Sequence, residues 1–159
     1  MASNQPILLA YDGSEGAKAA IDQAASLFPD RPLLVLSVGT SMAAAASASA
    51  IGLPTEVAGQ AIVRLDTEVQ ARAEGLAEEG AAAASAAGLQ ATALGALSDG
   101  RLWATILRIA EEHDVAAVIV GSRGRSDLKS MLLGSVSSGV VHHSTRPTVV
   151  VRGASTLPD

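Results

Sequence analysis

Cysteine is absent from this 159-residue chain, and aromatic residues are scarce, with one Trp, one Tyr and one Phe. The lack of cysteine excludes disulfide bonds, thiolate catalysis and metal sites built on cysteine, and it fits a reducing cytoplasm. Hydrophobic residues nevertheless make up 48% of the chain. The core must therefore be built from aliphatic side chains, and the length suits one domain rather than two.

Basic clusters and long hydrophobic runs are also missing. The net charge is −5, and the chain has no stripe of Lys and Arg that could displace counterions from a nucleic acid or bind an anionic membrane surface. Its apolar runs are far shorter than the ~20 residues of a membrane-spanning helix, and its N-terminus does not read as a signal peptide. We therefore expect a cytoplasmic protein with no nucleic-acid partner and no membrane partner.

Short apolar runs alternate with amphipathic segments along the chain. Runs that are apolar throughout predict strands that are buried on both faces, and apolar residues at steps of three and four predict helices between them. The loop expected at 39–57 contains Gly, Ser, Ala and Pro without clear periodicity. The predicted strands cover 7–11, 33–38, 89–96, 115–120 and 148–152, and the predicted helices cover 15–28, 58–87, 100–113 and 134–144.

The order of these elements is βαβαβαβαβ, which predicts an α/β fold. Helices that connect apolar strands imply right-handed crossovers and an open parallel sheet with helices on both faces. The chain shows no internal repeat and no sign of a second domain. We expect a single domain over residues 1–152, followed by a disordered tail over residues 153–159.

The unusual residues fall where the strands of such a sheet end. Asp12 follows the first predicted strand, Gly121 follows the fourth, and Gly134 and Ser135 begin the last predicted helix. Ligands of open α/β sheets bind beyond the carboxyl ends of the strands. A helix N-terminus attracts phosphate, and glycine lets the backbone approach an anion closely. These positions predict a phosphate-binding crevice, to which Ser137 could add a hydroxyl group.

Each of these residues also has a plain structural interpretation. The glycines could be turn residues, Asp12 could start a turn, and Ser135 and Ser137 could cap a helix. Arg123 and Arg125 could contact phosphate or lie on the solvated surface. His142 and His143 suit the end of a helix, and we predict no metal site on protein side chains. The P-loop motif and the dinucleotide motif GxGxxG after the first strand are both absent.

The segment GSRGRSDLKSMLLGS has the pattern G-x2-G-x9-G-[ST], which resembles the nucleotide motif of the universal stress protein family, ATP-binding type. ILLAYDGSEGAKAAI resembles the first strand and helix of that family, and HHSTRPTVVVR resembles its closing strand. The similarity extends over about residues 6–152. It implies a Rossmann-like sheet of the adenine nucleotide alpha hydrolase type, with strand order 3-2-1-4-5.

The resemblance also implies a ligand and its contacts. The ligand would be ATP with a nucleotide-bound Mg²⁺ ion. Asp12 would lie near the adenine and ribose, and the backbone of Val38 would contact the adenine. The resemblance places the ribose and phosphates against Gly121, Arg123, Gly124, Gly134, Ser135, Val136 and Ser137. It further implies a homodimer joined through the strand at 148–152, which is an edge strand in this topology.

The sequence favours a regulatory function over an enzymatic one. The sequence has no evident pair of nucleophile and base, and rapid hydrolysis needs a positioned water and a base or a charge stabiliser. We therefore expect a nucleotide-dependent stress sensor or regulator with at most slow ATP hydrolysis. Two alternatives remain open: a nucleotide-free dimeric scaffold or signalling module of the same fold, and a true nucleotide hydrolase.

Overall fold

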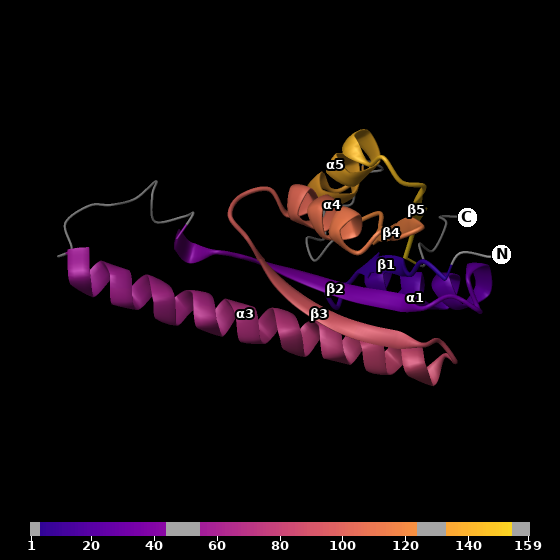
Figure 1. Ribbon diagram of the computed structural model, residues 1–159, viewed down its shortest axis with the longest axis horizontal. Coiled ribbons are helices and arrows are strands. Elements are labelled where there is room, and N and C mark those ends of the chain that lie inside the picture. Colours follow the sequence, from indigo (N-terminus) through magenta and orange to yellow (C-terminus); the bar gives the residue numbers. More distant parts are fainter. Residues whose placement is uncertain (1–3, 44–54, 124–132, 154–159) are drawn as a thin grey trace, which may run out of the picture.

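The computed structural model of the chain describes residues 4–43, 55–123 and 133–153, and in it strands and helices alternate as predicted (Figure 1). The predictions for Gly124, Arg125 and the tail beyond Gly153 lie outside the described residues. The elements are β1 (Ile7–Ala10), α1 (Glu15–Leu27), β2 (Leu33–Thr40), α3 (Thr55–Ala86), β3 (Ala91–Ser98), α4 (Leu102–Glu112), β4 (Ala117–Gly121), α5 (Ser135–His143) and β5 (Thr148–Val151).

The five strands form one parallel sheet in the order β3-β2-β1-β4-β5. This order confirms the fold class expected from the sequence. Leu9 at the centre of the sheet is in register with Val35 of β2 and Ile119 of β4. Helices α1 and α3 cover one face, and α4 and α5 cover the other.

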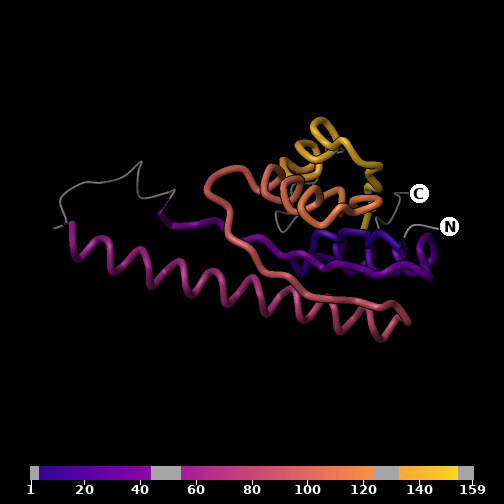
Figure 2. Tube along the Cα trace, viewed as in Figure 1, coloured from indigo at the N-terminus to yellow at the C-terminus, as the bar shows by residue number. Residues whose placement is uncertain are grey.

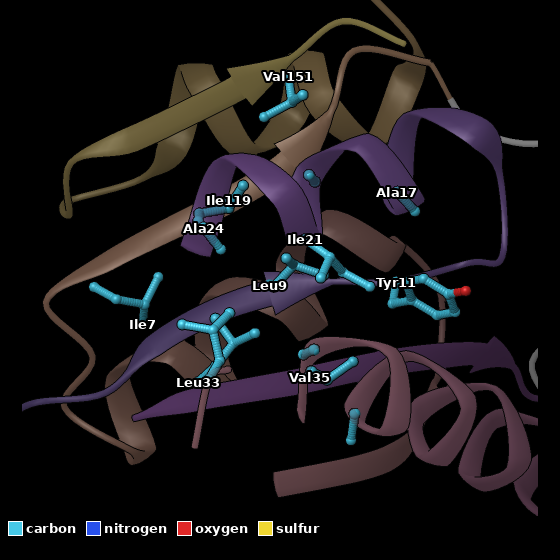
Figure 3. Close-up of a cluster of buried hydrophobic side chains, with 14 of the residues drawn as sticks. Ile7, Leu9, Tyr11, Ala17, Ile21, Ala24, Leu33, Val35, Ile119 and Val151 are labelled. Atoms are coloured by element: carbon cyan, nitrogen blue, oxygen red, sulfur yellow. The ribbon is translucent and has the colours of Figure 1, made fainter. Parts of the chain in front are cut away.

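Two aliphatic cores lie on the two faces of the sheet. The core under α1 and α3 includes Leu9, Ile21 and Tyr11, which Figure 3 shows among its side chains. The core under α4 and α5 includes Leu36 and Val118. Because both faces are covered, the central strands alternate between two interiors, and every position can be apolar.

Helix α1 begins directly beyond the end of β1 because of a polar turn. The carboxylate Oδ1 of Asp12 accepts a hydrogen bond from the Ser14 N–H at 3.0 Å, and Gly13 has a positive φ of 78° that favours glycine. The Ser14 hydroxyl then accepts from the N–H of Ala17 at 3.2 Å and caps the helix. This turn directs the start of α1 across the carboxyl end of the sheet.

The predicted loop at 39–57 is wrong at both ends. Gly39 and Thr40 continue β2 and pair with Leu97 and Ser98 of β3, while α3 already starts at Thr55. A side chain at position 39 would collide with Val69 of α3. Gly39 therefore marks the close approach of a helix to the sheet. Residues 44–54 of that predicted loop lie outside the described residues.

The apolar stripe predicted for α3 is buried only in its second half. Ala73, Ala77 and Ala84 are buried, whereas Leu65 is 42% exposed. The N-terminal end of α3 extends beyond the ends of the strands (Figure 2), so the sheet cannot cover the apolar residues of that part.

Two strands start later than their apolar sequences predict. Leu89 and Val115 are buried, but they precede β3 and β4. Their N–H groups donate to carbonyls of the preceding helices, to Ala84 at 3.0 Å and to Ala110 at 3.1 Å. Both residues therefore close a helix while filling the core, a combination that an apolar run does not reveal.

Candidate functional site

A cavity of ≈ 360 Å³ lies beyond the carboxyl ends of β1, β2 and β4 and is closed on one side by the first turn of α5. Its volume falls within the range of about 300–1,000 Å³ that is usual for small-molecule sites. Leu36, Val38, Ile106 and Val120 make most of one wall apolar. Such a cavity at the strand ends is where an open α/β sheet places its ligand.

Most of the site residues predicted from the sequence line this cavity. The structure brings together eight of them, which lie in or directly beside β1, β2, β4 and α5: Asp12, Val38, Gly121, Arg123, Gly134, Ser135, Val136 and Ser137. The ninth, Gly124, lies outside the described residues. The charged members of the described lining are Asp12 and Arg123, so the cavity carries one carboxylate and one guanidinium.

The first turn of α5 faces the cavity without a side-chain cap. Gly134 is the residue that precedes the helix, and as a glycine it has no side chain that could bond the first N–H groups. The N–H of Gly134 donates to the Ser122 carbonyl at 2.8 Å. The next N–H groups, those of Ser135 and Val136, have no preceding helical carbonyl to bond, as in the first turn of any helix. This turn therefore presents donors and a partial positive charge to the cavity.

Ser137 is part of the scaffold of this turn. Its side chain is buried, and its hydroxyl lies 2.9 Å from the Ser122 carbonyl oxygen and 3.0 Å from that of Gly134. A hydroxyl has one proton to donate, so these two carbonyls share it. Ser135, by contrast, is exposed. Of the two serines proposed for the phosphate end, Ser135 has the freer side chain.

Gly121 allows the first turn of α1 to pack closely against the end of β4. A Cβ atom on this residue would lie 3.2 Å from the carbonyl carbon of Gly16 and 3.4 Å from the nitrogen of Ala17, both in the first turn of α1. That separation is tighter than ordinary van der Waals contact, so a side chain would push α1 away from the end of β4. The glycine is thus explained by packing at this point, whatever ligand the cavity holds.

Sequence reasoning missed Tyr11 and Ser37, which also line the cavity. The Tyr11 hydroxyl donates to Oε1 of Glu79 in α3 at 2.8 Å. Burial, together with this bond to a carboxylate, raises the pKa of Tyr11 to about 12. Both residues stand next to residues that the sequence did single out, Asp12 and Val38. Their position at the ends of predicted strands is the feature of the sequence that could have identified them as cavity residues.

The histidines take structural positions. Nδ1 of His142 lies 2.8 Å from the Ser138 carbonyl oxygen, and His143 stacks on Trp103 with ring centroids 4.2 Å apart. Trp103 is not in the cavity lining, although Leu102 beside it is. Among the residues that the structure describes, no three His, Asp or Glu side chains are grouped so as to hold a metal ion. In the same residues, no helix has the length and apolar character to cross a membrane.

Comparison with known proteins identifies the family. Residues 3–152 match the model of the universal stress protein family. The chain is 35% identical over 148 residues to universal stress protein YxiE of Bacillus subtilis, an alignment that covers 92% of this chain and 97% of YxiE.

Solved structures agree with the fold. Universal stress protein UspA from Lactobacillus plantarum superposes with a TM-score of 0.72 at 21% identity, covering 96% of this chain and 100% of that one. The universal stress protein from Archaeoglobus fulgidus in complex with dAMP has a TM-score of 0.58 at 17% identity, covering 92% and 97%. The match over residues 3–152 and the identity to YxiE together show that this chain belongs to the universal stress protein family.

Proposed function

We propose that the cavity binds an adenine nucleotide, with ATP as the physiological ligand, and that the protein acts as a nucleotide-dependent stress sensor or regulator. The observation that carries this proposal is the chemical difference between the two ends of the cavity. The uncapped first turn of α5 lies at one end, and the apolar residues Leu36 and Val38 lie at the other. A triphosphate suits the first end, and a purine base suits the second.

The strand order sets the expected orientation of the ligand. Strand β1 lies between β2 and β4, and neighbouring strands are about 4.8 Å apart. The phosphates would lie at β4 and α5, the ribose near Asp12 at the end of β1, and the base beside Val38 at the end of β2. The structure with dAMP is of a relative with the same fold, and it supports an adenine nucleotide as the class of ligand.

Mg²⁺ would be held mainly by the phosphates, as is usual for this ion in nucleotide sites. Within the described lining, the carboxylate available to it or to the ribose hydroxyls is that of Asp12. Arg123 in the lining could stabilise charge on the phosphates, but we find no general base beside it among the described residues. We therefore propose slow hydrolysis at most. We also keep from the sequence the predictions of a single domain over residues 1–152 and of a cytoplasmic location.

Calorimetric titration with ATP, ADP, AMP and cyclic AMP in the presence of Mg²⁺ tests the proposal. Wild-type protein should bind ATP, and the variant Ser135→Glu should bind it at least about 10-fold more weakly, because a carboxylate at the first turn of α5 repels phosphate while remaining favourable for the helix. Ser85→Glu adds the same charge at the exposed far end of α3 and should leave the affinity unchanged.

Different results would favour the alternatives. Absence of binding at millimolar nucleotide would favour the nucleotide-free scaffold. Sustained turnover of ATP that is abolished in Asp12→Ala would favour the hydrolase.

We further propose a homodimer through β5. Strand β5 pairs with β4 on one side, and in this register the residues at 147, 149 and 151 direct their backbone groups toward β4. The N–H and C=O groups of Thr148 and Val150 therefore point away from β4, to an edge on which no other strand of the described residues pairs. A second copy could continue the sheet there across a two-fold axis.

The proposed dimer can be tested by removing a single backbone N–H group, that of Thr148. Thr148→Pro removes an outward donor at the first residue of the strand, where proline is tolerated. Thr148→Val keeps the donor. Sedimentation should give a dimer for wild type and Thr148→Val and a larger monomer fraction for Thr148→Pro. A wild-type monomer at all concentrations would contradict the proposal.

A further inference from the structure

Three nearly buried residues, Ser37, Thr105 and Ser122, carry hydroxyl groups that have no hydrogen-bond partner among the residues that the structure describes. Ser37 is 4% exposed, Thr105 is 8% exposed and Ser122 is 6% exposed. Burying a hydroxyl without a partner is unfavourable, so each such group calls for an explanation. Of the three residues, only Ser37 lines the cavity.

The Ser37 oxygen is open to that cavity. Within the described residues, every side-chain oxygen that is fully enclosed has a hydrogen-bond partner. The unpartnered oxygen of Ser37 is therefore not fully enclosed, although the residue as a whole is nearly buried. Since Ser37 lies in the cavity wall, the small accessible area that remains faces the space where a ligand would sit.

The Ser37 side chain lies on the face of the sheet that α3 covers. Successive residues of a strand alternate between the faces of a sheet, so Ser37 lies on the same face as Val35, toward α3. Tyr11 lies on that face too, but its hydroxyl already donates to Glu79. Leu76 of α3 adds an apolar surface to the same wall. Ser37 is thus a neutral polar group at an otherwise apolar end of the cavity.

Distance from the phosphate end identifies the part of the ligand that Ser37 meets. Strand β2 is two strands away from β4, which corresponds to about 10 Å. With phosphates at the first turn of α5 and ribose at Asp12, the group that reaches β2 is the base. We propose that the Ser37 hydroxyl hydrogen-bonds the base of the bound nucleotide and that Ser37 is a specificity-determining residue, an inference that rests on the proposed function.

The chemistry of a hydroxyl suits this contact. It can donate to a ring nitrogen of a purine and accept from an exocyclic amine. A bond of this kind selects for a ligand with a polar base edge, because a ligand without one would leave the hydroxyl unpaired. The contact adds nothing to the binding of phosphate, so affinity for the base and affinity for the phosphates should respond separately to its removal.

The test compares two ligands on two variants. Ser37→Ala removes the hydroxyl from the cavity, and Thr105→Val removes an unpartnered hydroxyl from a nearly buried residue that does not line it. Affinities for ATP and for ribose 5′-triphosphate, which has no base, are measured by calorimetry, directly or by competition. Thermal unfolding of each apo protein is measured alongside.

Ser37→Ala should bind ATP about 3- to 10-fold more weakly than wild type, the effect of one hydrogen bond between neutral groups. Its affinity for ribose 5′-triphosphate and its unfolding temperature should not fall, because the hydroxyl has no partner in the ligand-free protein. Thr105→Val should change neither affinity. If Ser37→Ala unfolds, Ser37→Cys carries the same test with a similar volume and a weaker hydrogen-bonding group.

Two results would overturn the inference while the proposed function stands. One is wild-type affinity for ATP in Ser37→Ala, and the other is equal weakening of ATP and ribose 5′-triphosphate. Failure of the wild-type protein to bind ATP is a different result, because it removes the proposed function itself and the inference with it.

Discussion

The Tyr11 hydroxyl donates a hydrogen bond to Oε1 of Glu79 at 2.8 Å, joining the residue that follows β1 to the C-terminal part of α3. The ring of Tyr11 is buried against Gly80, the next residue of the helix. This contact ties the longest helix to the floor of the candidate nucleotide cavity. It links residues 68 positions apart in the sequence.

The ionisation of Tyr11 can be followed without interference, because it is the only tyrosine of the chain. Burial and the Glu79 carboxylate raise its pKa to about 12, against about 10 in an unfolded chain. The folded state therefore holds this proton more tightly. The resulting stabilisation is complete below pH 10 and is lost as the pH rises through 12. Ultraviolet titration of the folded protein should show a midpoint near 12.

Glu79→Gln is the control for this titration. Without the carboxylate, the midpoint should fall below that of wild type but stay above 10, because burial, the largest cause of the shift, remains. A wild-type midpoint near 10 in protein that is still folded would show that the tyrosine is exposed and unbonded.

Gly80→Ala and Gly75→Ala should have opposite effects on stability. A Cβ atom at position 80 would lie 2.8 Å from Cγ of Tyr11 and 2.8 Å from Cγ1 of Val35, whereas position 75 has no such atom within 4 Å. Gly80→Ala should therefore destabilise the protein by about 1–3 kcal/mol. Gly75→Ala, in the same helix, should stabilise it by about 0.5–1 kcal/mol. Denaturant unfolding measures both, and equal effects would contradict the packing of Tyr11 on α3.

Arg146 should make the stability of the protein depend on acid pH. It donates to Glu111 at 2.9 Å, to Asp114 at 3.0 Å and to the Val115 carbonyl at 2.8 Å, joining the residue before Pro147 to the end of α4. The bond from Arg146 lowers the pKa of Glu111. Bonds first from Gln5 and then from Arg146 lower the pKa of Asp114.

A carboxyl group with a lowered pKa in the folded protein stabilises the folded state at pH values above about 4, the pKa of such a group in the unfolded chain. This stabilisation is lost as the pH falls through the pKa of the folded state. Arg146→Gln should therefore lower the unfolding temperature at neutral pH and flatten its decline in acid. Arg108→Gln removes the same charge from an exposed pair with Glu112 on α4, and it should have little effect. Equal pH profiles for the two variants would contradict the role of Arg146.

Asp12→Asn separates the two roles of Asp12. The asparagine side chain can keep the acceptor that holds the Ser14 N–H, so the turn and the stability should survive. The anionic acceptor for a ribose hydroxyl or Mg²⁺ is lost, and the affinity for ATP should fall about 10-fold or more, as expected for a hydrogen bond to a charged group.

Calorimetry and thermal unfolding measure the two effects, with Asp12→Ala as the variant that loses both roles. Full ATP affinity in Asp12→Asn would leave Asp12 as a turn residue only.

The apolar runs were sufficient to predict the parallel sheet, because a strand buried on both faces, such as Leu33–Leu36, carries a signal in every residue. The turn at Asp12 could also be predicted, because its conformation depends on neighbouring residues along the chain.

Contacts between residues far apart in the sequence were decided only by the tertiary structure. Gly39 looks like a loop residue until Val69 of α3 is found against it, and Leu65 looks like a core residue until α3 is seen to extend beyond the sheet. Ser37 becomes a candidate ligand contact only through a cavity that residues of several strands and helices line together. Local patterns determine which elements form, but the space left between the elements depends on how all of them pack.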